Sequence, residues 1–419
     1  MSGTVERDIN RGYVQFIKSI SSISEFQKRR ILRPLFLFSF HLIRNIVKLS
    51  FLPLLYFYGI FLILWIRFKF TFIKKRQPSL LHREALNYVP DFISQYPMHL
   101  YPIVSKSLEM AFIKEKVEKI TQNLQGGIVE LAIGDGTFSG RIFSEKHKIM
   151  GLDLNPYSLI QTKRYPHIAN RIVADCLNPP IEPGGASLIV SNNFLHHITK
   201  KKETLEHWSS IALYALFNEN TNYWAEGWSK PYLLKSIGFR KAARRVADRI
   251  ANHSLQTLWS KSDLGTLVRT FYDIQEEETF CHERIFFLSS ICSALLFCYG
   301  PPTPELQKRV MKGILLPITK RLSYHMAKAL IEYDAILPRD RDVFICWALK
   351  SKRLRQNFIG GRVTLVCPDC FERLQGNQCH CCQRTFEEKE GMLFLLPKEL
   401  AEEISFNQEK ANVLGEEHL

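Results

Sequence analysis

The segment Gly126–Gly140 (GGIVELAIGDGTFSG) constrains the fold more than any other part of the chain. A short apolar run ends at Glu130, and the closely spaced glycines Gly134 and Gly136 follow at once. Glycine tolerates left-handed backbone conformations and has no side chain, so this order is typical of a buried strand, a tight turn and a helix whose free N–H groups face a ligand. The alternative is a tight turn at a sheet edge that binds nothing. We expect the ligand-binding turn of an α/β domain.

Three further apolar runs end in polar residues. The runs KIMGLDLNP and RIVADCLNPP carry Asp153 and Asp175 at their ends, and ASLIVSNNFLHHI carries Asn192 and Asn193. For any one acid alone, a helix cap or a solvated turn is the alternative. Ligands of open parallel sheets bind beyond the carboxyl ends of the strands, so these ends are predicted to converge on one crevice.

The spacing of the glycines separates two classes of cofactor site. Gly134, Gly136 and Gly140 read GxGxxxG, one residue longer than the dinucleotide fingerprint GxGxxG. Read from Glu130, the order Glu130-x-Ala132-x-Gly134-x-Gly136 resembles motif I of class I S-adenosylmethionine-dependent methyltransferases of the type 11/12-like group. Ala132 stands where that family usually has its first glycine.

This resemblance covers roughly residues 109–239, with a last strand near 343–350, and implies a Rossmann-like α/β fold with S-adenosyl-L-methionine as cofactor. It implies that the turn holds the methionine portion, that Asp153 binds the ribose, and that Asp175 and Cys176 lie at the adenine edge. The implied cofactor-binding residues are Glu130, Ala132, Gly134, Gly136, Asp153, Asp175, Cys176 and Asn192.

The rest of the predicted methyltransferase domain, residues 77–355, is less regular. Residues 199–217 read as a helix, and the Pro-Gly-Gly turn that usually precedes a fifth strand in the family is missing from FNENTNYWAEGW. Residues 241–337 read as a helical insertion that includes the apolar run IFFLSSICSALLFCYGPP, a core or membrane-dipping helix. Insertions at this place usually form a lid over the acceptor in related enzymes, and an apolar lid indicates a substrate with a greasy portion.

The N-terminal part of the chain indicates a membrane anchor. Residues 1–33 form a basic amphipathic segment, and residues 34–76 contain the run 49–66 (LSFLPLLYFYGIFLILWI), which has no charge over 18 residues. That length reaches the minimum for a transmembrane helix, as a single pass or as one arm of a hairpin, whereas a buried core helix is the alternative. S-adenosylmethionine is cytosolic, so the domain after Arg76 is expected to face the cytoplasm.

A cysteine-rich unit is predicted at residues 362–400, before a polar tail at 401–419. Its two CxxC pairs, Cys367 with Cys370 and Cys379 with Cys382, lie eight residues apart. Four thiolates at this spacing suit a structural, tetrahedral zinc ion; a disulfide pair or a redox CxxC is the alternative. The unit resembles bacterial zinc ribbons related to the small activator subunit of several methyltransferases.

The leading functional hypothesis is a membrane-anchored methyltransferase that acts on a lipid, a lipid-linked sugar or another amphiphilic acceptor, with the bilayer as its partner. His196 and His197 are candidate bases, although either can simply cap or pack, and Asn193 can act through position alone. The net charge of +15 also admits nucleic acid, so an RNA or protein methyltransferase is the alternative, although no RNA-reading module is recognisable. A non-enzymatic membrane scaffold is a third interpretation, which the intact glycine turn disfavours.

Overall fold

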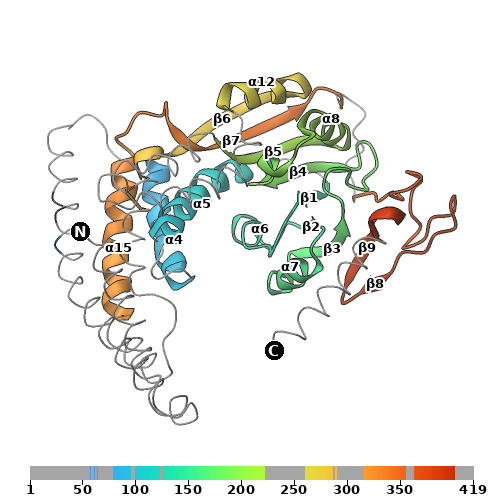
Figure 1. The fold of residues 1–419 in the computed structure, drawn as a ribbon, viewed down its shortest axis with the longest axis horizontal. Helices are drawn as coiled ribbons and strands as arrows, with labels where there is room; N and C mark the ends of the chain where they lie inside the picture. Colours follow the sequence, from blue (N-terminus) through green and yellow to red (C-terminus); the bar gives the residue numbers. More distant parts are fainter. Residues whose placement is uncertain are drawn as a thin grey trace, which may run out of the picture. The chain divides into compact units, whose positions relative to one another are not determined.

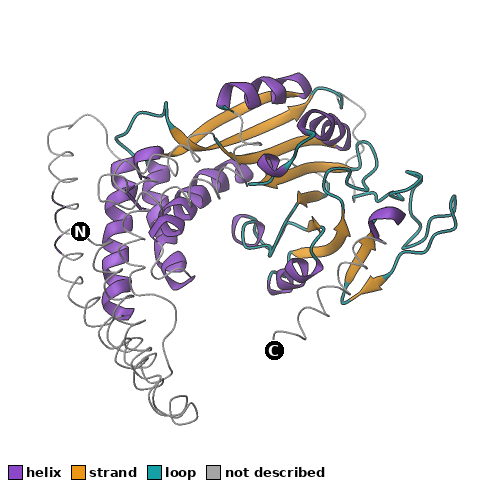
Figure 2. Ribbon diagram, in the orientation of Figure 1, coloured by secondary structure: helices purple, strands orange, loops and turns teal. Residues whose placement is uncertain are grey.

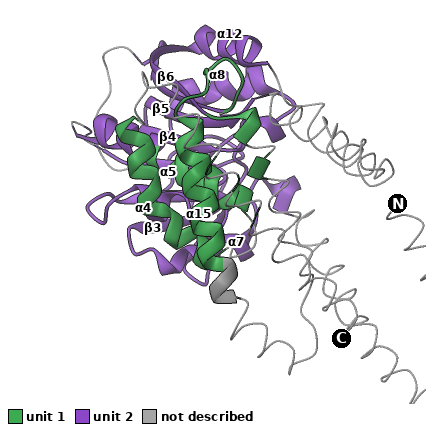
Figure 3. Cartoon of the chain, turned by 90° about the vertical axis from the view of Figure 1, so that its left-hand side faces the viewer, with its two compact units in different colours: residues 1–111, 223–256, 281–343 green, residues 112–222, 257–280, 344–419 purple. Residues whose placement is uncertain are grey.

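The computed structural model describes residues 79–95, 100–122, 126–221, 260–285, 316–354 and 363–401, with a few isolated positions elsewhere. The chain divides into two compact units (Figure 3). We call residues 1–111, 223–256 and 281–343 the helical unit, and residues 112–222, 257–280 and 344–419 the sheet unit. The predicted methyltransferase domain, 77–355, is therefore divided between them.

A nine-stranded sheet runs in the order β6-β7-β5-β4-β1-β2-β3-β9-β8 (Figure 1). Strands β1 to β5 pair in parallel, and β7 pairs antiparallel to β5. The chain passes outward from β1 through β2 to β3 and then returns to β4 on the other side of β1, which makes the β1/β4 boundary the point where the strand order reverses. The strands are β1 Ile128–Leu131, β2 Ile149–Asp153, β3 Ile168–Ala174, β4 Ala186–Asn192, β5 Ala212–Asn220, β6 Tyr272–His282, β7 Asp342–Ser351, β8 Glu388–Lys389 and β9 Met392–Leu395. This arrangement confirms the predicted Rossmann-like α/β fold.

Short helices follow the first strands, and longer ones cover the β5 side of the sheet (Figure 2). Asn155 caps α7 by accepting hydrogen bonds from the next turn, and Pro156 occupies the first helical position, where its missing N–H costs nothing. Trp208 of α8 is fully buried and packs on Phe217 of β5 at 5.6 Å between ring centroids. The helices and turns concerned are α5 Leu100–Thr121, α6 Ser139–Ile142, α7 Pro156–Gln161, η3 Thr162–Arg164, η4 Leu195–His197, α8 Lys201–Ile211 and α12 Lys261–Phe271.

The helical unit contains α4 (Leu80–Gln95), the start of α5 and α15 (Leu316–Asp334). A buried charge network joins α4 to α15. Asp334, which is fully buried, bonds His82 Nε2 at 3.0 Å, Arg339 Nη1 at 2.9 Å and the backbone N–H of His282 at 2.8 Å. Burial acts to raise the pKa of Asp334, but the bond to His82 and the charge of Arg339 outweigh it and hold the pKa at about 2. The network therefore fixes one end of α15 to α4 within this unit.

Two sequence predictions about secondary structure are wrong. The helix predicted over 199–217 ends at Ile211, and β5 begins at Ala212. The segment ALYALF is rich in helix formers, but it pairs with β4 on one side and β7 on the other, and tertiary pairing overrides propensity.

The helical lid predicted over 241–337 is wrong between Tyr272 and His282, which form the edge strand β6. The acidic side chains of this strand point alternately to its two faces. Glu276 and Glu278 pair with Lys116, whereas Glu277 pairs with Lys261. That period of two is the period of a strand, and the lysines that pair with the two faces come from α5 and α12.

The cysteine-rich unit is joined to the sheet by strand pairing. Strand β9 pairs in parallel with β3, with Ile172 opposite Leu393 and Ala174 opposite Leu395. Farther along, the Thr364 N–H donates to the Gly185 carbonyl at 3.2 Å. The unit thus covers the β3 edge and leaves the two-residue strand β8 at the margin, a short edge that limits pairing with other chains.

Several predicted segments lie outside the described residues: the basic N-terminus 1–33, almost all of the anchor 34–76 with its span 49–66, most of the apolar run 285–302, and nearly all of the tail 401–419. Among the helices that the structure does describe, none combines the length and apolar character needed to cross a bilayer.

Candidate cofactor site and metal site

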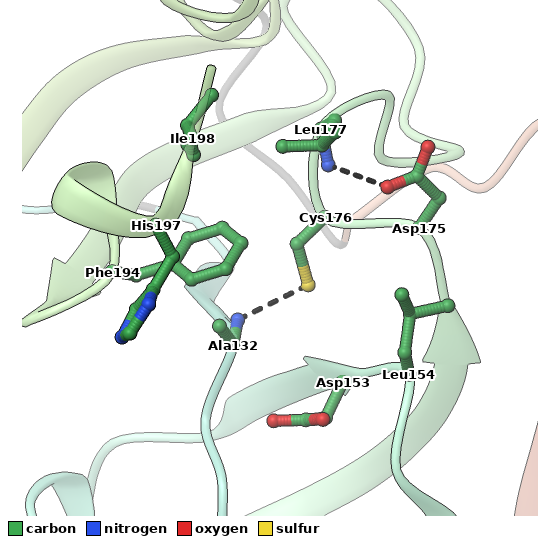
Figure 4. Close-up of a pocket in the computed structure, with 9 residues that line it drawn as sticks. All are labelled: Ala132, Asp153, Leu154, Asp175, Cys176, Leu177, Phe194, His197 and Ile198. Atoms are coloured by element: carbon green, nitrogen blue, oxygen red, sulfur yellow. Dashed lines mark hydrogen bonds between the residues drawn. The ribbon is translucent and has the colours of Figure 1, made fainter. Parts of the chain in front are cut away.

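The carboxyl ends of four neighbouring strands, β1 to β4, surround a cavity of about 230 Å³ (Figure 4). Its lining comes from the segments that follow these strands. The lining residues are Ala132, Asp153, Leu154, Asp175, Cys176, Leu177, Phe194, His197 and Ile198. Five of the residues singled out in the sequence are among them: Ala132, Asp153, Asp175, Cys176 and His197. The crevice predicted from the strand ends is therefore present.

The glycine turn is tied to the neighbouring strand ends by its backbone. The Ala132 N–H donates to Cys176 Sγ at 3.1 Å, and the Gly134 N–H donates to Asp153 Oδ2 at 2.7 Å. Ala132 has φ 55°, a left-handed conformation that suits the glycine usual at this position in the resembled family. The turn therefore keeps its shape despite the substitution, at a cost of about 1–2 kcal/mol.

The two glycines of the turn have different reasons to lack a side chain. Both are left-handed, with φ 57° at Gly134 and 72° at Gly136. A Cβ at Gly134 would meet no atom within 4 Å, whereas a Cβ at Gly136 would lie 2.9 Å from Ile168 Cδ1 and 3.0 Å from Thr162 Cγ2. Protein atoms therefore fill the space beside Gly136, and of the two glycines only Gly134 borders open space.

Asp153 lies at the end of β2, and each of its carboxylate oxygens accepts one hydrogen bond. Oδ2 accepts from Gly134 N, and Oδ1 accepts from Asn155 N at 2.8 Å. A carboxylate has about four lone-pair sites, so each oxygen retains capacity for one more donor. The pair of ribose hydroxyls that the family resemblance assigns to this residue fits that remaining capacity.

Glu130 is buried below the turn, with 1% of its surface exposed. Its Oε2 has no hydrogen-bond partner among the described residues. Desolvation raises the pKa of Glu130 to about 8, and the nearby charge of Asp153 adds to the shift. A buried polar atom without a partner is rare. A pKa of about 8 means that the carboxyl group is mostly protonated at neutral pH, and a ligand with a positive charge beside it would favour the ionised form.

Four of the lining residues are apolar and come from two sides of the cavity (Figure 4). Leu154 and Leu177 lie beside Asp153 and Asp175, Phe194 and Ile198 lie across from them, and sequence reasoning missed all four. Leu154 remains 40% exposed, which is unusual for a leucine directly after a buried strand. Two of these residues could have been found from their position in the sequence, because Leu154 and Phe194 each follow the polar end of a strand. Apolar side chains on two sides of a cavity suit the flat faces of an adenine ring.

Asp175 caps its own turn in this structure. Its Oδ1 accepts from the Leu177 N–H at 2.9 Å, as Figure 4 shows, and Oδ2 accepts from Asn178 Nδ2 at 3.5 Å. Cys176 is buried beside it, and burial raises the pKa of its thiol well above the ordinary value. The thiol is therefore a neutral, packed group.

The candidate catalytic residues after β4 form a polar cluster with the end of β5. Asn192 Oδ1 accepts from Asn193 Nδ2 at 3.1 Å and from Asn218 Nδ2 at 2.6 Å. His196 Nδ1 lies 3.0 Å from Oε2 of Glu219, which sequence reasoning missed because its strand was not identified. Of the four predicted residues in this region, only His197 lines the cavity; Asn192, Asn193 and His196 do not.

The four predicted metal ligands come together at one point. The Sγ atoms of Cys367, Cys370, Cys379 and Cys382 all lie within 4.8 Å of one another. The Cys367–Cys382 and Cys370–Cys379 sulfur pairs are 3.6 Å and 3.4 Å apart, far beyond the roughly 2.05 Å of a disulfide. Thiolates bind zinc at about 2.3 Å in a tetrahedron, whose edges approach these separations. The cluster therefore suits a structural zinc ion with no open position for catalysis.

No protein-family model and no curated protein matches this sequence. Solved structures do match. A putative sarcosine dimethylglycine methyltransferase from Galdieria sulphuraria matches with 13% identity and a TM-score of 0.38, over 60% of this chain and 88% of that one. Phosphoethanolamine N-methyltransferase 2 from Haemonchus contortus, solved with S-adenosyl-L-methionine, matches with 12% identity and a TM-score of 0.34, over 57% of this chain and 52% of its own. The cyclase SpnF matches with 9% identity and a TM-score of 0.36, over 57% and 80%.

Replacing each glycine of the turn by alanine separates ligand approach from packing. Gly134→Ala and Gly136→Ala both carry the left-handed cost of about 1–2 kcal/mol. We expect Gly134→Ala to weaken S-adenosylmethionine binding about tenfold or more, because its methyl group enters open space beside the ligand. Gly136→Ala should instead lose a further 1–3 kcal/mol or so of stability through overpacking. Urea unfolding and calorimetric titration measure the two effects; equal stability of the two variants contradicts this assignment.

Glu130→Gln tests the buried carboxyl group. The pKa of Glu130 is about 8 in the folded chain and near 4.5 when unfolded, so unfolding releases a proton between these values and wild-type stability falls as pH rises from 4.5 to 8. Glutamine cannot titrate. Relative to Glu130→Gln, the wild type should therefore lose on the order of 3 kcal/mol between about pH 5 and pH 8. The exposed Glu203→Gln is the control, and parallel pH curves for wild type and Glu130→Gln refute the prediction.

Metal analysis tests the cysteine cluster. Protein purified without added zinc should carry one zinc ion per chain, and Cys379→Ser should lose it together with several kcal/mol of stability. Cys381→Ser is the matched control, because Cys381 is exposed and lies outside the cluster. A disulfide in place of the metal, or loss of zinc in Cys381→Ser, is the contrary outcome.

Proposed function

We propose that this protein is an S-adenosylmethionine-dependent methyltransferase. The observation that carries the proposal is the cavity at the reversal of the strand order, where the carboxylate of Asp153, the open space at Gly134 and apolar side chains lie together. Dinucleotide binding is the competing use of such a site, and the GxGxxxG spacing disfavours it.

The chain's own residues account for binding and orientation in this proposal. Asp153 accepts hydrogen bonds from the ribose hydroxyls, and Leu154 and Phe194 contact the adenine from two sides. The positive charge of the ligand's ammonium group favours the ionised form of the buried Glu130, which then binds the amino-acid end. The bound cofactor supplies a methyl group activated on a sulfonium. Methyl transfer is an in-line displacement, so the protein contributes mainly by holding the acceptor against that carbon and by excluding water.

For the acceptor, we propose an amphiphilic molecule met at a membrane surface. The support is in the sequence: an uncharged run at 49–66, a net charge of +15 and an apolar run at 285–302. An anchored, basic enzyme meets lipid-linked acceptors by diffusion in the plane of the bilayer, and each basic residue near anionic headgroups adds about 1 kcal/mol of attraction. A catalytic domain on the cytoplasmic side would have access to its cofactor.

The test adds purified full-length protein and methyl-labelled S-adenosylmethionine to a membrane extract and to total RNA. We expect label in the lipid-extractable fraction. A chain that lacks residues 1–76 should bind the cofactor with the same affinity as the full-length protein. It should label membranes at least about tenfold more slowly, because it is no longer held at the membrane that contains the acceptor. Label in RNA or protein would contradict the lipid acceptor and support an RNA or protein methyltransferase instead. Failure of the full-length protein to bind the cofactor would overturn the methyltransferase proposal itself.

A further inference from the structure

Glu219 is a completely buried carboxylate at the end of β5. Its Oε1 accepts from the backbone N–H groups of Phe194 at 2.8 Å and Leu195 at 2.6 Å. Its Oε2 lies 3.0 Å from Nδ1 of His196. One side chain on β5 therefore holds both the turn that follows β4 and the ring of the histidine in that turn.

The parallel register explains how Glu219 reaches this turn. Asn192 of β4 lies opposite Asn218 of β5, and the Asn193 N–H donates to the Asn218 carbonyl at 2.7 Å. Glu219 comes next, level with the start of η4.

The arrangement fixes the tautomer of His196. An ionised carboxylate only accepts hydrogen bonds, so the His196 Nδ1 atom carries the proton and the Nε2 atom keeps its lone pair. Among the described residues, nothing hydrogen-bonds to Nε2 of His196. The ring is thus held in the form that takes up a proton.

The surroundings place this pair beside the cavity. The His196 ring lies 4.0 Å, between centroids, from the ring of His197, which lines the cavity. Lys201 on α8 is another charged group near Glu219. Burial lowers the pKa of Lys201, and the charge of Glu219 opposes that shift. The Nζ atom of Lys201 donates to the Ile198 carbonyl at 2.6 Å.

We propose that Glu219 is a positioning residue that holds His196 as the general base, and that the acceptor is a group that gives up a proton on methylation, a hydroxyl or an ammonium. This inference rests on the proposed function. The acceptor oxygen or nitrogen forms a bond to the methyl carbon, the carbon–sulfur bond breaks, and its electron pair stays on sulfur to give S-adenosylhomocysteine. The acceptor proton passes to Nε2 of His196 and then to water.

The variant Glu219→Gln distinguishes positioning from simple packing. The N–H groups of Phe194 and Leu195 need an acceptor, so they take the glutamine oxygen and leave its NH₂ group facing Nδ1 of His196. Nδ1 must then accept, and the proton moves to Nε2. The shape is retained while the base is lost.

Nuclear magnetic resonance of the full chain labelled with ¹⁵N-histidine reads this tautomer directly, at about pH 8.5, where ordinary histidines are neutral. His196→Gln assigns the signals by their loss. We expect a protonated Nδ1 and a bare Nε2 in the wild type, and the reverse in Glu219→Gln. A protonated Nε2 in the wild type, or the same tautomer in both proteins, overturns the proposal.

Labelling with methyl-labelled cofactor and membrane extract then tests the acceptor class. Glu219→Gln should lower transfer about 100-fold or more while cofactor affinity stays within about threefold, and the exposed Glu203→Gln should match the wild type. The label should resist mild alkali, as in an ether or an amine. Release as methanol identifies a carboxylate acceptor, which needs no base, and overturns the proposal. If calorimetry shows that the wild-type protein binds no S-adenosylmethionine, the proposed function itself is wrong. That result is distinct from a failure of the Glu219 proposal, in which the cofactor still binds.

Discussion

Strand β1 is hydrogen-bonded along both edges, to β2 and to β4, and the positions of the site residues depend on that double pairing. Val129 lies opposite Met150 on one side and Ile189 on the other, and all four residues of β1 are buried. The pairing brings the glycine turn level with the end of β2, where Asp153 accepts the Gly134 N–H, and level with the end of β4, from which Phe194 follows. The cavity lies where the strand order reverses: the chain leaves β1 towards β2 and β3, and it returns to β4 on the other side of β1.

Local patterns in the sequence were enough to predict this part of the molecule. Strand, turn and polar strand end follow one another within a few residues around Gly134 and Asp153, and the structure agrees. Roles that depend on distant neighbours could not be predicted in the same way. Gly136 lacks a side chain because of Thr162 and Ile168, and Leu154 remains exposed because it borders the cavity.

Strand β5 shows the same limit at the level of secondary structure. Its alanines and leucines favour a helix, and only pairing with β4 and β7 makes a strand of them. With that strand unidentified, Glu219 had no predicted place, and His196 stood without the carboxylate that holds it. The cysteine spacing predicted the cluster of four thiols for the opposite reason, since two CxxC pairs specify such a site locally. The pairing of β9 with β3 could not be foreseen. It places Cys367 and Cys379 in one apolar cluster with Cys176, so the candidate metal site and the candidate cofactor site share a core.

The central claim is that S-adenosylmethionine binds at the carboxyl ends of β1 to β4, and hydrogen–deuterium exchange with and without S-adenosylhomocysteine tests its location most directly. The claim predicts slowed exchange at residues 132–136, 153–155, 175–178 and 194–198, because each segment either lines the cavity or adjoins a residue that does. Exposed segments far from it in the sheet unit, such as the start of α12 at 261–263, should exchange as before. Protection elsewhere, or none at a ligand concentration that saturates a calorimetric titration, contradicts the account.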